Sequence, residues 1–180
     1  MGDIIAKINE RQLVENNVKI SLISVKTNNV IKTITGHNNG TIYICKYLRD
    51  ALSGDYVINE RPGTIVPCIA AGNDGMEEIT NGVTYQGVIR KNPFDEDADV
   101  GCSVTLTFLI PSTFSAAQKI VGFRLYSYSS SEVKKTKKDM YAEIDLRKIE
   151  DDPEAGVIIT EGTNLKVEWT LSVRFDWIGD

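Results

Sequence analysis

The chain has 180 residues, of which 42% are hydrophobic and 25% charged, with a formal net charge of −5 at pH 7. This length suits one domain that folds without disulfides or structural metals, and the acidic balance argues against a nucleic-acid-binding protein. No run approaches the roughly 20 apolar residues of a membrane-spanning helix, and the first residues lack the basic start and apolar stretch of a secretion signal.

The first residues and the first strands differ in pattern. Residues 1–16 are polar and weakly periodic, so we expect an N-terminal arm that packs on a partner chain. Residues 17–180 are expected to form a single β-sandwich domain. Residues 18–25 alternate as a strand does, and residues 30–35 return after a turn that contains two asparagines. These two strands and the turn between them predict a β-hairpin.

The period changes in residues 36–54. Apolar residues recur on one helical face there, namely Ile44, Cys45, Leu48, Ala51 and Leu52. We predict one short helix over about residues 41–53, with Asn39 or Thr41 at its start and Gly54 at its end. His37 precedes this helix in a turn-rich segment and is expected to be a loop or capping residue.

The middle of the chain reads as a series of strands. Residues 64–70 contain Pro67, which indicates an edge strand or a bulge. Residues 71–78 are expected to be a loop, and residues 83–90 a strand broken near Gly87. Further strands are expected at the following ranges: 103–110, 119–128, 140–146 and, more briefly, 157–160. The segment between the last two, residues 147–156, is expected to turn.

The last segment carries the strongest local pattern. From Leu165 to Phe175 apolar and polar residues alternate without a break, which predicts a long strand with one buried and one wet face. Such strands are typical of antiparallel sheets. The fold class we predict is therefore mostly β: an antiparallel two-sheet sandwich, or a jelly-roll-like fold, with one short helix.

A search for chemistry finds no catalytic, cofactor-binding or metal site. His37 is the single histidine, and the chain has neither a GxSxG elbow nor a CxxC pair. Cys45, Cys68 and Cys102 are an odd, widely spaced set in apolar stretches, so buried thiols are expected rather than disulfides. We expect a protein that is not an enzyme and needs no cofactor.

Two charged loops and a set of tyrosines leave alternatives open. Asp95, Asp97 and Asp99 resemble the start of a calcium loop, but Gly101 and Leu106 stand at the wrong places, so a solvated acidic loop is favoured over calcium binding. A basic loop is either a solvated connection or an electrostatic latch onto an acidic neighbour; it contains Lys134, Lys135, Lys137 and Lys138. Sheet packing is favoured over a sugar-binding platform for Tyr126, Tyr128 and Tyr141.

Residues 30–72 resemble a pattern found in structural proteins of tailed bacteriophages. A strand leads into a turn, a short helix and then a proline-containing strand that ends at a glycine. The matching residues are His37, Asn38 and Thr41, then Leu48, Ala51, Leu52 and Gly54, then Arg61, Pro62 and Gly72. The segments TFLIPSTF and GTNLKVEWTLSVRF are similar to the closing strands of such proteins.

The resemblance implies a structural subunit of a phage tail, baseplate, collar or head surface. Its partners would be copies of itself, in a homo-oligomer, and other virion proteins, with neither nucleic acid nor membrane bound. Such a protein is made in the host cytoplasm and ends in the virion. The alternative is a carbohydrate-binding or host-attachment module of the same fold. As a candidate interface we name the two oppositely charged loops, 95–99 and 134–138.

Overall fold

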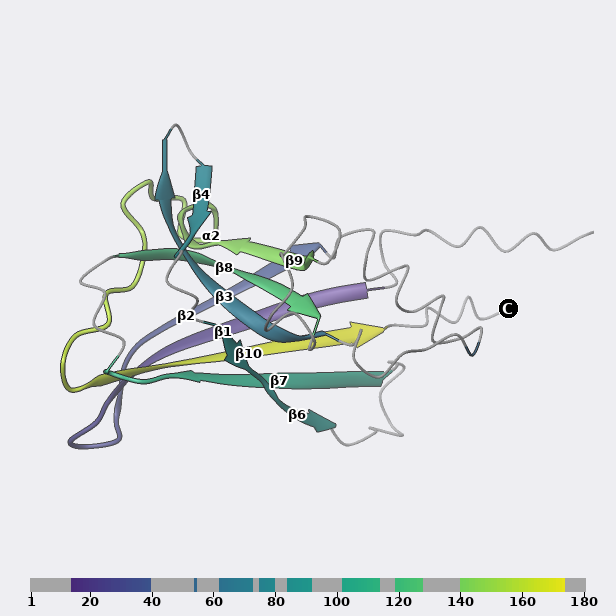
Figure 1. The fold of residues 1–180 in the computed structure, drawn as a ribbon, viewed down its shortest axis with the longest axis horizontal. Coiled ribbons are helices and arrows are strands. Elements are labelled where there is room, and N and C mark those ends of the chain that lie inside the picture. Colours follow the sequence, from purple (N-terminus) through teal and green to yellow (C-terminus); the bar gives the residue numbers. More distant parts are fainter. Residues whose placement is uncertain are drawn as a thin grey trace, which may run out of the picture.

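The structure is a computed structural model of the chain, and it describes residues 14–39, 54, 62–72, 75–79, 84–91, 102–113, 119–127 and 140–173. These residues form strands and one short helix (Figure 1). In chain order the elements are β1 (Val14–Ser24), β2 (Val30–Asn39), β3 (Pro62–Ala71), β4 (Gly75–Glu78), β5 (Tyr85–Gln86), β6 (Val88–Lys91), β7 (Cys102–Ile110), β8 (Ile120–Ser127), β9 (Met140–Asp145), α2 (Leu146–Ile149) and β10 (Thr163–Val173).

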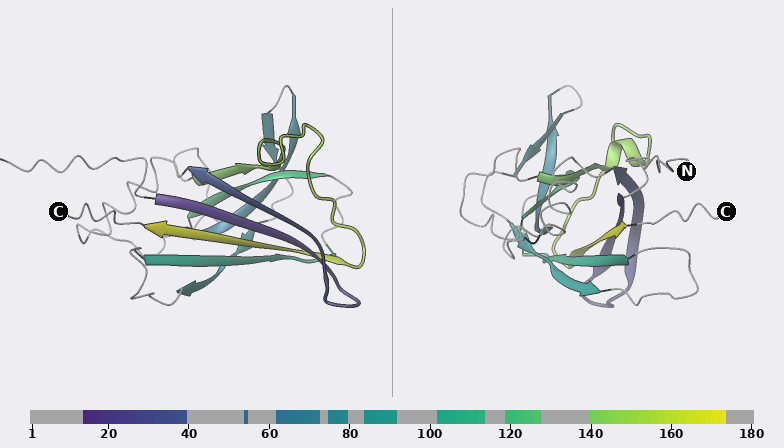
Figure 2. Two further views of the ribbon diagram at one scale, coloured as in Figure 1. Left: turned by 180° about the vertical axis from the view of Figure 1, so that it is seen from behind. Right: turned by 90° about the vertical axis from the view of Figure 1, so that its right-hand side faces the viewer.

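The strands form two sheets with antiparallel pairing throughout, which confirms the predicted fold class. The first sheet has the order β2-β1-β10-β7-β6, and the second has the order β4-β3-β8-β9, with β5 also paired to β3. Figure 2 shows the two sheets facing each other. Among the described residues, no helix is long and apolar enough to cross a membrane.

Strand β10 lies at the centre of the first sheet and confirms the predicted alternation. It pairs with β1 along its whole length and with β7 from Leu165 to Val173. Leu165, Val167 and Trp169 are fully buried, whereas Lys166 and Glu168 between them stay partly exposed. One face of β10 therefore builds the core and the other faces outward, as a period of two requires.

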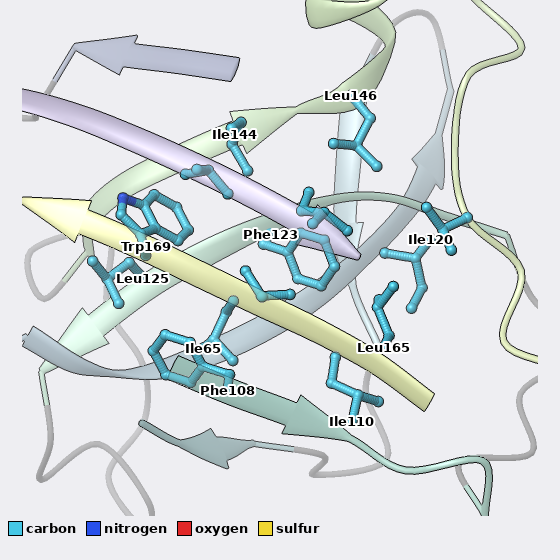
Figure 3. Packing of buried hydrophobic residues seen from close by; sticks show 14 of the residues in the cluster. Ile65, Phe108, Ile110, Ile120, Phe123, Leu125, Ile144, Leu146, Leu165 and Trp169 are labelled. Carbon is cyan, nitrogen blue, oxygen red and sulfur yellow. The ribbon is translucent and has the colours of Figure 1, made fainter. Parts of the chain in front are cut away.

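The core lies between the two sheets and draws on both (Figure 3). Its largest fully buried side chains are Trp169 and Leu165 from β10, Phe108 and Ile110 from β7, Phe123 and Leu125 from β8, and Ile65 from β3. Leu146 of α2 joins them, so the short helix closes the core beside β9. The apolar contacts between sheets, which come from distant parts of the sequence, hold the sandwich together.

Gly87 is the point where the chain changes sheets. It separates β5, which pairs with β3, from β6, which pairs with β7, so the predicted break near Gly87 is confirmed. The amide of Gly87 donates to the carbonyl of Gly63 at 2.7 Å. A Cβ placed there would lie 2.8 and 2.9 Å from two ring carbons of Phe108. The crossing therefore requires a residue without a side chain.

Pro67 lies in an interior strand, so the expectation of an edge strand is wrong, while that of an irregularity is confirmed. Its carbonyl accepts from the amide of Ile79 at 3.2 Å, and the missing N–H of a proline faces the same way as its carbonyl. On that side β5 pairs only up to Ile65 and β4 begins at Cys68. The pairing with β8 also shifts between Cys68 and Ile69.

Other boundaries differ from expectation. Strand β2 continues through His37 to Asn39, because β1 extends back to Val14 and pairs with it, so residues 14–16 of the expected arm belong to a strand. Residues 75–78, expected to be a loop, form β4 by pairing with β3. The helix predicted over 41–53 lies outside the described residues. The described helix is α2, in a segment expected to turn, and the side chain of its N-cap residue, Asp145, accepts from the backbone amide of Arg147.

We predict that Trp169→Ala lowers the free energy of unfolding by about 3–5 kcal/mol, as loss of a buried aromatic side chain does. Trp169→Phe is expected to cost less than about 2 kcal/mol. Among the described residues the buried indole Nε1 has no hydrogen-bond partner, and removing an unpaired buried donor returns part of its desolvation cost. Urea unfolding of the three proteins measures both values, and equal costs for the two substitutions would contradict this packing.

Gly87→Ala is predicted to lower the free energy of unfolding by about 1–3 kcal/mol, because the new methyl group overlaps the Phe108 ring. Phe108→Leu removes the overlapping ring carbons. Phe108→Leu alone leaves a cavity, which the methyl group of Gly87→Ala partly fills. The double variant should therefore lose less stability than the sum of the two single variants. The matched measurement is a double-mutant cycle in urea, and simple additivity would show that Gly87 is not held against Phe108.

Candidate functional site

The outer face of the first sheet carries polar side chains in two rows, with one residue from each of β2, β1, β10 and β7. They lie here because the opposite face of the same strands is apolar and buried. The strand register places them directly opposite one another. The first row is His37, Asn17, Thr170 and Thr105, and the second is Thr35, Lys19, Glu168 and Thr107.

An open groove of about 360 Å³ runs between these rows. We refer to it as the β-face groove; its lining residues are Asn17, Val18, Lys19, Thr35, Gly36, His37, Thr105, Glu168 and Thr170. They come from β1, β2, β7 and β10, so the groove exists only once the strands farthest apart in sequence have paired. Figure 1 shows β2, β1, β10 and β7 side by side.

Hydrogen bonds hold several of these side chains in place. His37 Nδ1 donates to Asn17 Oδ1, since an amide oxygen can only accept. The hydroxyls of Thr105 and Thr170 lie 2.9 Å apart and share a hydrogen bond. Lys166 Nζ donates to Glu168 Oε1 at 2.6 Å, which balances the negative charge at one side of the groove.

The groove offers hydroxyls, an amide, an imidazole and both charges, a set that suits hydrogen bonding to a polar ligand. It does not resemble a nucleophile activated by a base, because His37 bonds to an amide and Glu168 to a lysine. Sequence reasoning placed His37 in a turn before a helix. That placement is wrong, because pairing with Asn17 keeps His37 in β2.

A second polar cluster lies on the second sheet and joins three strands. Arg124 of β8 donates through Nε to Glu143 of β9 at 2.7 Å, and through its two other nitrogens to Glu78 and the Met76 carbonyl of β4. The Tyr126 hydroxyl also donates to Glu78. Burial alone would lower the pKa of Arg124, but the hydrogen bond to Glu143 and the neighbouring negative groups together outweigh it, so the pKa is raised.

A neighbouring set of hydrogen bonds joins α2 to β4. Asp145 accepts from the backbone amide and the side chain of Arg147, with the closest side-chain contact at 2.8 Å. Arg147 also donates to the Gly75 carbonyl at 3.1 Å. Burial favours a higher pKa for Asp145, yet the hydrogen bonds from Arg147 lower it below its usual range. These groups pair with one another, so we assign this cluster a structural role.

Two of the three tyrosines considered as a sugar platform are buried and not available for stacking. Tyr126 is 4% exposed and Tyr141 is 6% exposed, and Tyr128 lies outside the described residues. Burial, followed by the hydrogen bond to Glu78, raises the pKa of Tyr126. The favoured reading, sheet packing, is therefore confirmed for Tyr126 and Tyr141.

The charged loops named as a candidate interface lie outside the described residues, so the structure does not place Asp95, Asp97, Asp99, Lys134, Lys135, Lys137 or Lys138. Cys68 is a buried thiol, as expected, 3.7 Å from the Val66 carbonyl. Cys102 begins β7, and Cys45 lies outside the described residues. Within the described residues, no three His, Cys, Asp or Glu side chains come together as metal ligands.

Sequence reasoning predicted all four strands of the groove but identified outward-facing residues only in the last one. The alternation in the last strand marked Glu168 and Thr170 as outward-facing. Nothing local placed Asn17 or Thr105 beside them, because that depends on which strands pair with β10. The one available signal was the polar half of the alternation in residues 18–25 and 103–110.

Comparison of the chain with protein-family models, with curated proteins and with solved structures gave no match.

We predict that Asp145→Asn lowers the free energy of unfolding at pH 7 by about 1–3 kcal/mol, the range for a hydrogen bond to a charged group. A carboxyl with a lowered pKa in the folded state stabilises above its ordinary pKa of about 3.9 and loses that contribution as pH falls through the folded value. The difference between the two proteins should therefore close below about pH 4.

The matched control is Asp151→Asn, an exposed residue just beyond α2 with φ of 49°, which asparagine tolerates. It should leave the free energy of unfolding nearly unchanged across the same range. Urea unfolding from pH 2.5 to pH 7 gives the comparison. Equal stability of Asp145→Asn and the wild type at every pH would mean that Asp145 acts only as a helix cap, a role that asparagine fills equally well.

Proposed function

We propose that this chain is a non-enzymatic structural subunit of a bacteriophage particle. It works by assembling with copies of itself and with neighbouring virion proteins. It is made in the host cytoplasm and resides in the virion. The proposal rests on the resemblance of residues 30–72 to phage structural proteins and on the apolar surface that the folded chain leaves exposed.

The observation that carries it is an apolar patch at the tip of the β1–β2 hairpin. Val25, Val30 and Ile31 are 52%, 57% and 58% exposed, and all three belong to the turn and the strand end beside it. We call these residues the hairpin-tip patch. Single exposed apolar residues are ordinary on protein surfaces, but a group at a projecting tip is typical of a protein contact.

A smaller patch lies at the opposite edge of the same sheet. Val88 of β6 and Leu109 of β7 are 62% and 56% exposed. Val88 pairs with Thr107, so it lies diagonally across from Leu109 on the outer face. We call these two residues the opposite-edge patch. A subunit with contact surfaces at both edges of one sheet is suited to have neighbours on two sides, as assembly requires.

Electrostatic contacts complete the proposed mode of assembly. The acidic loop 95–99 and the basic loop 134–138 have opposite signs, and contacts between them on neighbouring copies would guide the subunits into register. Apolar contacts would supply most of the affinity. Because exposed charges are screened beyond about 8 Å at physiological ionic strength, assembly should weaken as salt rises.

The alternative function is host attachment through a carbohydrate, and the β-face groove is the observation that favours it. Its hydroxyls, amide and charged groups match the hydrogen-bonding demands of a sugar. Binding of the isolated protein to a glycan array, abolished by Asn17→Ala, would favour this alternative over assembly alone.

We predict that the chain is recovered in purified particles at a fixed ratio to the major head or tail protein. Replacing the hairpin-tip patch by Val25→Thr, Val30→Thr and Ile31→Thr should lower its incorporation at least several-fold, because the apolar contact is lost. Quantitative mass spectrometry of particles from complemented phage measures the ratio. Thermal unfolding of the isolated variant should match the wild type, since these side chains are exposed.

The matched control replaces the opposite-edge patch by Val88→Thr and Leu109→Thr, which removes similar apolar surface elsewhere. A loss with the hairpin-tip variant alone identifies the tip as the contact, and a loss with both identifies two contacts. Absence of the wild-type chain from particles, despite its presence in infected cells, would refute the proposed function. Normal incorporation of both variants would refute assembly through these patches.

A further inference from the structure

The four outer strands of the two sheets differ greatly in length. At the edges lie β6 and β4, with 4 residues each, β9 with 6, and β2 with 10. Natural sheets keep exposed edges short or protected, because an open edge pairs with other chains. Strand β2 departs from that rule, so its outer side needs an explanation.

The outer side of β2 is open to solvent. Val30, Ile31, Lys32, Thr33, Thr35 and His37 are all exposed, and among the described residues only β1 pairs with β2. The inner face is covered instead, because Ile34 is buried and Gly36 lies against Ile149. The strand is therefore packed on its inner face, while its outward residues are exposed and, among the described strands, only β1 pairs with it.

Backbone hydrogen bonds establish which amides face the open edge. Ser24 bonds to Asn29 and Asn28 across the turn, so its amide groups face β2, whereas the amide of Val25 bonds to Gly162 on the other side. Orientation alternates along a strand. Leu22, Ile20 and Val18 therefore face β2, and their partners Lys32, Ile34 and Gly36 face β1.

The residues between them must face outward. Thr33, Thr35 and His37 direct both their N–H and C=O groups away from β1, into solvent. The stretch has few of the usual protections. Strand β2 contains no proline, and its one irregularity in pairing lies near its start, opposite Leu22 and Ile23 of β1. Its one charged side chain, Lys32, forms an ion pair with Glu150 of the same chain at 3.4 Å.

We propose that β2 pairs with β2 of a second copy in antiparallel fashion, about a two-fold axis at Thr35. The outward-facing residues are spaced evenly around Thr35, so Thr35 meets its own copy and Thr33 meets His37. Each outward N–H then donates to a C=O of the other copy. Lys32 falls opposite Asn38, which keeps the two lysines apart.

A second copy fits this edge better than an unrelated strand. The outward-facing residues include no Lys, Arg, Asp or Glu, and threonine pairs well with threonine across strands. A two-fold contact also pairs the β2 edge of each copy with that of the other, so neither β2 edge is left to recruit further chains. It would join the two first sheets into one continuous sheet and bring the two β-face grooves side by side, since Thr35 and His37 line each groove.

This proposal names one surface for the assembly function proposed above, but it concerns the isolated protein and is tested without particles. Thr35→Pro removes the outward N–H at the axis while leaving the pairing with β1, and proline is tolerated at such edge positions. Thr35→Val keeps the N–H and the shape of the side chain. Sedimentation equilibrium measures the mass of each against the chain mass of 20.0 kDa.

The wild type and Thr35→Val should sediment as dimers, and Thr35→Pro should dissociate with a dissociation constant raised at least tenfold. Circular dichroism checks that Thr35→Pro is folded. A monomeric wild type at high protein concentration, or a folded Thr35→Pro that dimerises like the wild type, overturns the proposal. Neither result bears on whether the chain is found in particles. Conversely, absence of the chain from particles does not bear on whether it dimerises through β2.

A second variant covers the case in which Thr35→Pro does not fold. Thr35→Cys places two thiols at the axis, where paired Cα atoms are about 5.5 Å apart, within reach of a disulfide. Mild oxidation should give a covalent dimer on a non-reducing gel. Glu161→Cys, at an exposed turn, is the control and should stay monomeric. Equal cross-linking of the two variants, or none with Thr35→Cys, overturns the proposal.

Discussion

The pairing of β10 on both of its sides is the constraint on which the rest of the structure depends. β10 comes last along the chain, yet it lies between β1 and β7 and pairs with each over nearly its full length. Its buried face supplies Leu165, Val167 and Trp169 to the core, and its outer face supplies Glu168 and Thr170 to the groove. The core and the candidate site are thus two faces of one strand.

The second sheet depends on the first through two connections. At Gly87 the chain passes from β5 to β6 without a loop. The residue at this position cannot have a side chain, because the Phe108 ring lies against it. At the other side, Ile149 of α2 packs against Gly36 of β2, and Lys32 of β2 forms an ion pair with Glu150 at 3.4 Å. Both contacts fix how the sheets face each other.

The features of the fold that could be predicted from the sequence are those whose cause lies in neighbouring residues. The β1–β2 hairpin was predictable because Asn28 tolerates its φ of 56° and the flanking residues alternate. The break at Gly87 was visible, but the change of sheet was not, since a periodic pattern does not identify a strand's partner. Strand β4 was missed because its Gly and Glu residues have low strand propensity, and pairing with β3 overrides it.

The groove and the open edge depend on which strands are neighbours in the sheet. Sequence patterns predicted the strands themselves but not their order in the sheet. Amide hydrogen exchange, followed residue by residue at low and high protein concentration, tests the account most directly. We expect Ile34 and Gly36 to be protected at both concentrations, and Thr33, Thr35 and His37 to become protected only at the high one. Fast exchange of Thr33, Thr35 and His37 at both concentrations would contradict pairing of β2 between copies.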